Sequence, residues 1–299
     1  MPIARLHLAF VPLRRVRLML LALVWLVPVR LAAQDRVHVE TEVALYPHKT
    51  AQLFKYTLLL PRNIPGRQTV LDVSFSQTPE RVFEEGDNRY AVFRFVRLAR
   101  PETLRISFDL LVDPVAPPVA DGPPSDALLA PEPYLESQDP AIRQAAAALR
   151  AATPAATAQR IYQFVRDTLH YDAAQLGARG AAEALRSGTG DCTEYADLMV
   201  ALCRAAAIPS RTASGLVVGL AGDNPNHHWA EVWLPGQGWT TFDPTLDNRR
   251  TDRSRPEIHY VLLSTLRLDP HCQGGNNYWQ AWGQVEVMHR YKTRLLRED

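Results

Sequence analysis

The sequence predicts an α+β protein in which a small β-sandwich precedes helices packed on an antiparallel sheet. Alternating apolar and polar residues recur from Val37 to Val112, and no helical pattern interrupts them. Helical patterns begin only after a proline-rich segment, and strand patterns return downstream of the helices. Strands, then helices, then strands again is an order typical of α+β folds.

The first predicted domain covers residues 34–113. Its alternating segments are short, for example at 37–43, 91–96 and 104–110, and turn-forming residues separate them. Several short strands without a helix indicate a β-sandwich. No cluster of chemically reactive residues appears in this region, so we expect a packing or recognition module.

A stiff linker is predicted at residues 114–133, which contain seven prolines. The remaining residues, 134–299, form the second predicted domain. Its predicted helices span 137–152, 154–169 and 181–186, and a further helix starts at Cys192. Its predicted strands span 211–218, 229–234, 239–243, 259–263 and 285–291.

The first 33 residues have the pattern of an export signal. Arginines precede an apolar stretch from Leu18 to Val29, and Leu31-Ala32-Ala33 suits a cleavage site. The stretch is shorter than the roughly 20 residues of a spanning helix. We therefore expect a periplasmic or secreted protein with no stable membrane insertion after cleavage. Pro28 and Arg30 lie close to the cut, which leaves an uncleaved N-terminal anchor as the alternative.

Charge and cysteine content narrow the function. The net charge is +1, so no strong field attracts nucleic acid, and we expect no nucleic-acid partner. The three cysteines are an odd number for an oxidising compartment. We expect Cys192 to be free and Cys203 to be a buried apolar residue, with a Cys203–Cys272 disulfide as the alternative.

The most informative segment starts at Gly188 and leads into the helix predicted at Cys192. Asp191 is a suitable N-cap, and Glu194 lies three residues later, which is the spacing of a capping box. Cys192 then occupies the first helical turn, where the partial positive charge of the helix end favours a thiolate. This position suits a nucleophile.

A nucleophilic thiol needs a base, and the base needs an orienting partner. The segments 226–234 and 239–245 flank a Pro/Gly turn and predict a hairpin, which brings Asp243 opposite the adjacent histidines His227 and His228. Side chains alternate along a strand, so the two histidines lie on opposite faces. Alternation alone does not decide which of them meets Asp243.

Three ordered blocks of the chain resemble the transglutaminase-like core superfamily. The first is Gly190-Asp191-Cys192 with Tyr195-Ala196, and the second runs from Leu202 to Arg211. The third joins His227, Trp229 and Glu231-Val232 to Gly238-Trp239 and Phe242-Asp243-Pro244-Thr245. The resemblance covers roughly residues 134–245. The β-rich half loosely resembles N-terminal modules of exported bacterial relatives.

The resemblance implies a papain-like fold with a catalytic triad. Cys192 is the implied nucleophile, His227 the base and acid, and Asp243 the orienting residue. His228 stands where the family has a small residue, and it remains the alternative base. The resemblance also implies a thioester acyl-enzyme formed from protein or peptide amides, followed by hydrolysis or by transfer to an amine.

Several further expectations follow from the residues. The backbone N–H of Cys192 is one candidate oxyanion donor, and Gln175 and Tyr171 are candidate side-chain donors. The spacing of His228, His259, His271 and Cys272 fits no compact zinc set, and no acidic loop has calcium spacing, so we expect no metal or cofactor. The oligomeric state stays open. A binding module with an idle triad is the alternative to an enzyme.

Overall fold

The computed structural model describes residues 34–113, 124–175, 177–219, 224–249 and 258–296. The predicted export signal, residues 1–33, lies outside this part, as do residues 114–123 of the predicted linker. The described residues form antiparallel sheets first and helices packed on a sheet afterwards, so the α+β prediction is confirmed.

Two four-stranded antiparallel sheets enclose the first hydrophobic core. Their strands are β1 (Asp35–Pro47), β2 (Ala51–Leu60), β3 (Gln68–Phe75), β4 (Arg81–Glu85), β5 (Asn88–Leu98), β6 (Glu102–Val112), β13 (Asn277–Trp282) and β14 (Val285–Leu296). One sheet has the order β14-β1-β6-β3, and the other has the order β13-β2-β5-β4. Alternate side chains such as Phe54, Phe93 and Phe108 are buried between the sheets, because successive residues of a strand point to opposite faces.

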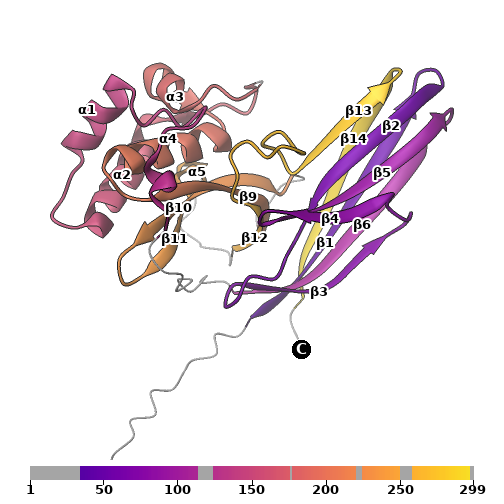
Figure 1. Ribbon diagram of the computed structural model, residues 1–299, viewed down its shortest axis with the longest axis horizontal. Helices are drawn as coiled ribbons and strands as arrows, with labels where there is room; N and C mark the ends of the chain where they lie inside the picture. Colours follow the sequence, from indigo (N-terminus) through magenta and orange to yellow (C-terminus); the bar gives the residue numbers. More distant parts are fainter. Residues whose placement is uncertain (1–33, 114–123, 176, 220–223, 250–257, 297–299) are drawn as a thin grey trace, which may run out of the picture. The chain divides into compact units, whose positions relative to one another are not determined.

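The two C-terminal strands correct the predicted domain boundary. The sequence prediction assigned residues 134–299 to one catalytic domain, but β13 pairs with β2 and β14 pairs with β1 (Figure 1). Alternation shows that a segment is a strand, but it does not show which sheet the strand joins. Residues 277–296 therefore complete the N-terminal sandwich rather than the helical part.

The helices follow their sequence signals closely. The described helices are the 3₁₀ turn η1 (Asp126–Leu129), α1 (Pro140–Ala148), α2 (Pro154–Thr168), α3 (Ala181–Ser187), α4 (Cys192–Ala205) and α5 (Pro244–Arg249). The side chain of Asp139 accepts hydrogen bonds from two N–H groups at the start of α1, and Thr153 caps α2. Both helices have proline at their first position, where no helical N–H bond is lost.

Helix α4 is the centre of the second core. It packs with α1, α2 and α3 and with a sheet of order β11-β10-β9-β12. The strands of this sheet are β9 (Ser210–Val218), β10 (Asn226–Leu234), β11 (Gly238–Phe242) and β12 (His259–Ser264). A short parallel pair, β7 (His170–Tyr171) and β8 (Thr189–Gly190), leads into α4. The sequence predicted α4 and the hairpin β10–β11, but it did not predict β7, β8 or β13.

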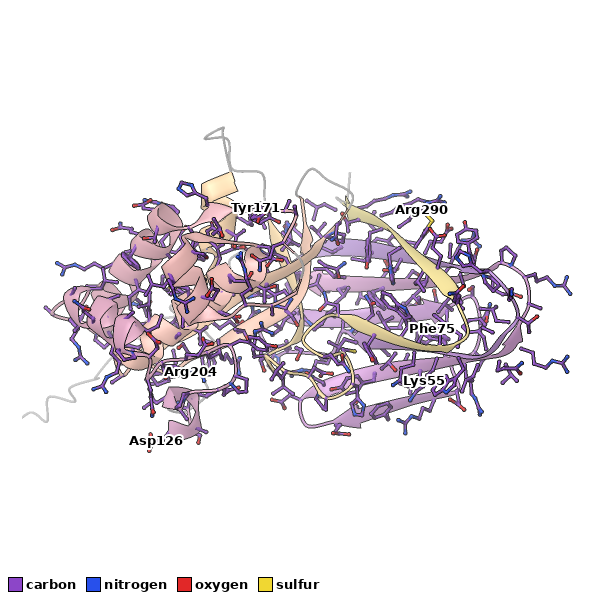
Figure 2. The ribbon with its side chains drawn as sticks, turned by 90° about the horizontal axis from the view of Figure 1, so that it is seen from above. Lys55, Phe75, Asp126, Tyr171, Arg204 and Arg290 are labelled. Carbon is purple, nitrogen blue, oxygen red and sulfur yellow. The ribbon has the colours of Figure 1, made fainter. Side chains whose placement is uncertain are left out.

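Arg204 fastens the end of α4 to the last part of the predicted linker (Figure 2). Its side chain is buried and donates to the backbone oxygen of Ala130 at 2.6 Å and to Glu132 at 2.6 Å. A third bond reaches the backbone oxygen of Ser210 at 2.9 Å. Residues 130–132 are thus bonded to the helical part and do not act as a free spacer.

The sandwich and the helical part share buried polar contacts. Gln68 at the start of β3 bonds both the N–H and the C=O of Leu262 in β12, each at 2.9 Å. Asn88 and Tyr90 of β5 donate to the carboxylate of Asp269, at 2.7 and 2.6 Å. Contacts between Cα atoms accordingly place the described residues in one compact unit.

Within the described residues, no helix has both the length and the apolar character required to cross a membrane.

Gly215 generates a stability prediction for the sheet that carries β10. A Cβ atom at this position would lie 2.0 Å from the backbone oxygen of Val261 and 3.1 Å from the Trp229 ring. Because the nearest atom belongs to the backbone of β12, relief requires the two strands to separate. We expect Gly215→Ala to lower the free energy of unfolding by about 3 kcal/mol or more.

Urea denaturation of Gly215→Ala beside Gly275→Ala measures this effect. A Cβ at Gly275 would meet its nearest neighbour at 3.4 Å, an ordinary contact, so this control should change stability by less than about 1 kcal/mol. Equal unfolding midpoints for the two variants would contradict the packing described for β9 and β12.

Candidate active site

Cys192 lies at the N-terminal tip of α4, as the capping-box spacing predicts. The Asp191 carboxylate accepts from the N–H of Thr193 at 2.7 Å, and Glu194 accepts from the N–H of Asp191 at 3.2 Å. The Cys192 thiol is free and partly exposed. The positive end of the helix dipole therefore acts on a side chain that solvent can reach.

A buried carboxylate, Glu194, holds the loop in front of this helix tip. Glu194 has no exposed surface and accepts from the backbone N–H of Arg179 at 2.9 Å and from the Gln175 side-chain amide. A Cβ on Gly190 would lie only 2.5 Å from Glu194, so the close approach requires glycine here. The loop is thus fixed by hydrogen bonds on both sides of Gly190.

The three candidate oxyanion donors predicted from the sequence differ in their positions and in their hydrogen bonds. The Gln175 amide donates to Glu194 and to the backbone oxygen of Gly177, so both of its N–H groups have acceptors. Tyr171, which Figure 2 labels, pairs with Gly190. Its ring lies 6.5 Å from that of Tyr195. The N–H of Cys192 is among the first four of α4, which find no acceptor within the helix.

The hairpin β10–β11 brings His227 and Asp243 together. His227 is the second residue of β10, and Asp243 directly follows β11. The Nε2 atom of His227 lies 2.7 Å from Oδ2 of Asp243, and both side chains are buried. The other carboxylate oxygen, Oδ1, accepts from the N–H of Leu246 at 3.2 Å and so caps α5.

Tyr260 is a neighbour of this pair that the sequence did not reveal. Its hydroxyl donates to Oδ2 of Asp243 at 2.9 Å, the same oxygen that faces His227. Residues 259–263 were predicted as a strand, but alternation cannot show which side chain of the sheet a tyrosine will contact. Only the pairing of β12 with β9 brings Tyr260 to Asp243.

Cys192 also lies near enough to His227 to raise the pKa of its ring. Because Nε2 faces Asp243, Nδ1 is the ring nitrogen that is left for the sulfur. Burial acts to lower the pKa of His227. The Asp243 carboxylate, and then Cys192, outweigh burial and raise this pKa to about 10. The structure therefore places Cys192 beside a hydrogen-bonded pair, His227 and Asp243.

His228 differs from His227 in its electrostatic environment. Burial and the positive charge of Arg267, followed by His227 itself, lower the pKa of His228 to about 3. Arg267 is held by two bonds to Asp197 of α4, at 2.6 and 2.9 Å. The ring that meets Asp243 is that of His227, whereas His228 lies beside fixed positive charge.

The sheet that contains β10 packs one face against α4, and the N-terminal sandwich covers the opposite face. Glu231 has no exposed surface and pairs with Arg67, which precedes β3, and with Arg211 of β9. The two arginines hold the pKa of Glu231 below its usual value against the opposing effect of burial. Ile64 packs against Trp229 on the same face. The strand that carries His227 is therefore supported from both sides.

The remaining cysteines lie apart from this site. Cys203 belongs to the core around α4, and Cys272 belongs to the core of the sandwich. Both thiols are free and buried, so the alternative Cys203–Cys272 disulfide is not formed. Among the residues that the structure describes, no three His, Cys, Asp or Glu side chains gather as a metal-binding group.

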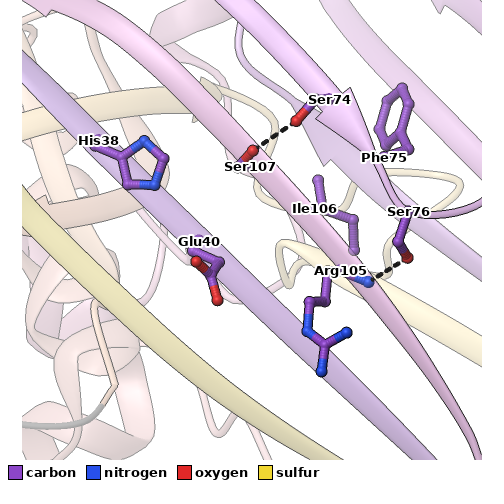
Figure 3. Close-up of a pocket in the computed structure, with 8 residues that line it drawn as sticks. All are labelled: His38, Glu40, Ser74, Phe75, Ser76, Arg105, Ile106 and Ser107. Atoms are coloured by element: carbon purple, nitrogen blue, oxygen red, sulfur yellow. Dashed lines mark hydrogen bonds between the residues drawn. The ribbon is translucent and has the colours of Figure 1, made fainter.

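A depression of about 300 Å³ lies on the sandwich (Figure 3). Its lining residues, on or next to β1, β3 and β6, are His38, Glu40, Ser74, Phe75, Ser76, Arg105, Ile106 and Ser107. None of the candidate active-site residues is among them.

The two adjacent histidines should titrate on opposite sides of neutrality. We expect His227 to stay protonated through about pH 8 and His228 to stay neutral down to about pH 4. The raised pKa of His227 means that its contribution to stability is complete below its usual 6.5 and is lost as the pH rises toward about 10. The lowered pKa of His228 gives a contribution that is present above 6.5 and is lost toward pH 3.

An NMR titration of the histidine ring signals checks this expectation. His227→Gln and His228→Gln identify the two rings. If either ring titrated near pH 6.5, the arrangement of charges described for this site would be wrong.

Comparison with known proteins finds relatives for the segment that carries these residues. The model of the transglutaminase-like superfamily matches residues 143–244. A segment of 69 residues is 39% identical to the uncharacterized protein YebA of Bacillus subtilis and covers 19% of this chain and 9% of that protein. A protein-glutamine gamma-glutamyltransferase of Pseudomonas aeruginosa is 38% identical over 66 residues, which are 19% of this chain and 10% of the relative. These two matches thus span about a tenth of the length of each relative.

One solved structure matches most of the fold. It comes from Cytophaga hutchinsonii and is provisionally described as a cysteine protease. The match has a TM-score of 0.68 at 15% identity and covers 89% of this chain and 92% of the other, so it extends over the β region as well. The family model thus identifies a transglutaminase-like core at residues 143–244. The structural match shows that the fold also includes an N-terminal β region.

Proposed function

We propose that this protein is an exported cysteine enzyme of the transglutaminase-like type that acts on protein or peptide amides. The observation that carries the proposal is the grouping of Cys192, at the tip of α4, with the hydrogen-bonded pair His227 and Asp243. A buried imidazole between a thiol and a carboxylate is the arrangement that nucleophilic catalysis requires.

In the first step Cys192 attacks the amide carbonyl carbon as a thiolate, and His227 carries the proton as an imidazolium. A C–S bond forms and the carbonyl oxygen becomes an oxyanion. When the C–N bond breaks, His227 gives its proton to the leaving amine, and a thioester remains on Cys192. Asp243 stabilises the imidazolium and orients the ring through Nε2.

In the second step His227 removes a proton from water or from an acceptor amine, which attacks the thioester. The C–S bond breaks, the thiolate returns, and the product is a carboxylic acid or a new amide. The backbone N–H of Cys192 is our proposed oxyanion donor. We favour hydrolysis, because Cys192 is partly exposed and transfer to an amine requires that water be excluded.

The cellular setting is part of the proposal. The pattern of residues 1–33 supports export to the periplasm or beyond, with a protein or peptide substrate there. The oxidising setting suits a single exposed thiol with two buried cysteines.

Alkylation tests whether Cys192 is activated. We expect iodoacetamide to modify Cys192 at pH 6 at least about tenfold faster than it modifies a free thiol, because His227 keeps the thiolate paired. His227→Ala should abolish the advantage, and Cys192→Ser should abolish labelling, since Cys203 and Cys272 are buried and their thiol pKa values are raised by burial. A rate equal to that of a free thiol would favour a binding module with an idle triad.

A glutaminyl peptide offered with a labelled amine separates the two reactions. Hydrolysis releases ammonia without incorporating the label, whereas transfer incorporates it, and Cys192→Ser does neither. Peptide cleavage without ammonia release would identify a protease acting on the main chain. An activated thiol that gives none of these products would contradict action on peptide amides.

A further inference from the structure

The carboxylate of Asp243 has a second donor beside His227. The hydroxyl of Tyr260 lies 2.9 Å from Oδ2, and Nε2 of His227 lies 2.7 Å from the same atom. Oδ1 accepts a longer bond, of 3.2 Å, from the N–H of Leu246. Two hydrogen bonds thus hold the carboxylate independently of His227. The bond from the Tyr260 hydroxyl is the shorter of the two.

Tyr260 is itself held in place from several directions. Its backbone pairs with Val217 of β9. Its ring lies 5.0 Å from the ring of Trp229, within a cluster that includes Ile64. Two residues along, Gln68 bonds the N–H and C=O of Leu262 and so fixes β12 against the sandwich. A hydroxyl on so constrained a ring is a fixed donor.

We propose that Tyr260 is a positioning residue that fixes the rotation of the Asp243 carboxylate, so that Oδ2 faces His227. This inference rests on the proposed function. A carboxylate can rotate about its Cβ–Cγ bond, and a bond of 3.2 Å to one oxygen restrains that rotation weakly. The hydroxyl bond to the other oxygen defines the angle while His227 exchanges its proton.

The titratable groups nearest to His227 come from three elements. Cys192 belongs to α4, Asp243 follows β11, and His228 is the next residue of β10. Tyr260 of β12 contributes a neutral donor. Removal of its hydroxyl leaves every charge in place, so a change in the titration of His227 reports the orientation of Asp243.

The test is the pH profile of Cys192 alkylation by iodoacetate. This anion reacts fast only while the thiolate is beside a protonated His227, so the alkaline limb of a bell-shaped profile reports loss of the imidazolium proton. In Tyr260→Phe the limb should move to lower pH by about 0.5–1 unit, because a less well oriented carboxylate stabilises the imidazolium less. Asp243→Asn should move the alkaline limb further toward low pH.

Tyr90→Phe is the matched control. Tyr90 also donates its hydroxyl to an aspartate, Asp269, at 2.6 Å, but this pair lies in the contact between β5 and the segment after β12. Tyr90→Phe should lower the temperature of thermal unfolding and leave the pH profile of Cys192 alkylation as it is in the wild type. Circular dichroism establishes that both variants fold.

Each outcome separates the two proposals. If the wild type gave only the single rise of an ordinary thiol, the proposed function would fail. If the wild type gave a bell and Tyr260→Phe left its alkaline limb in place or moved it to higher pH, only the positioning role of Tyr260 would be overturned.

Discussion

Three separate pieces of the chain meet at the carboxylate of Asp243. Its Oδ2 atom accepts from His227 of β10 and from Tyr260 of β12, and its Oδ1 atom accepts from the first turn of α5. A buried carboxylate is costly unless hydrogen bonds compensate for lost water. The hydrogen bonds that compensate for the burial of Asp243 also set the orientation of His227. Local stability and the proposed chemistry therefore depend on the same contacts.

The sheet behind this carboxylate is supported by the N-terminal sandwich. Glu231 lies four residues after His227 on the same strand and is fully buried, and its charge is balanced by Arg67 and Arg211. Gln68 binds the backbone of β12, two residues from Tyr260. A buried charge that loses its partner destabilises a fold strongly. The sandwich therefore acts as a structural part of the sheet that carries His227, which is more than a separate packing module.

The helix tip and the hairpin supply opposite halves of the chemistry. The capping box places Cys192 where the dipole of α4 favours negative charge. The hairpin supplies an imidazole whose pKa is raised to about 10 by Asp243 and Cys192 despite burial. One residue further, the pKa of His228 falls to about 3, chiefly through burial and then through the charge of Arg267. Adjacent residues of one strand thus receive opposite electrostatic environments, because alternation turns them toward different surroundings.

Local patterns in the sequence were sufficient for the elements that carry the site. Periodicity gave the helices and most strands, the Asp191/Glu194 spacing gave the start of α4, and the Pro/Gly turn gave the hairpin that joins His227 to Asp243. These features depend on residues close together in the chain. Two contacts between segments far apart in the chain were decided only by the tertiary structure: the pairing of β13 and β14 with the sandwich, and the burial of Glu231 by Arg67. The approach of Tyr260 to Asp243 also needed the tertiary structure, because β12 and β11 are not neighbours in their sheet. Strand alternation fixes which face a side chain takes, but partner strands separated by more than a hundred residues are chosen by packing of the whole core.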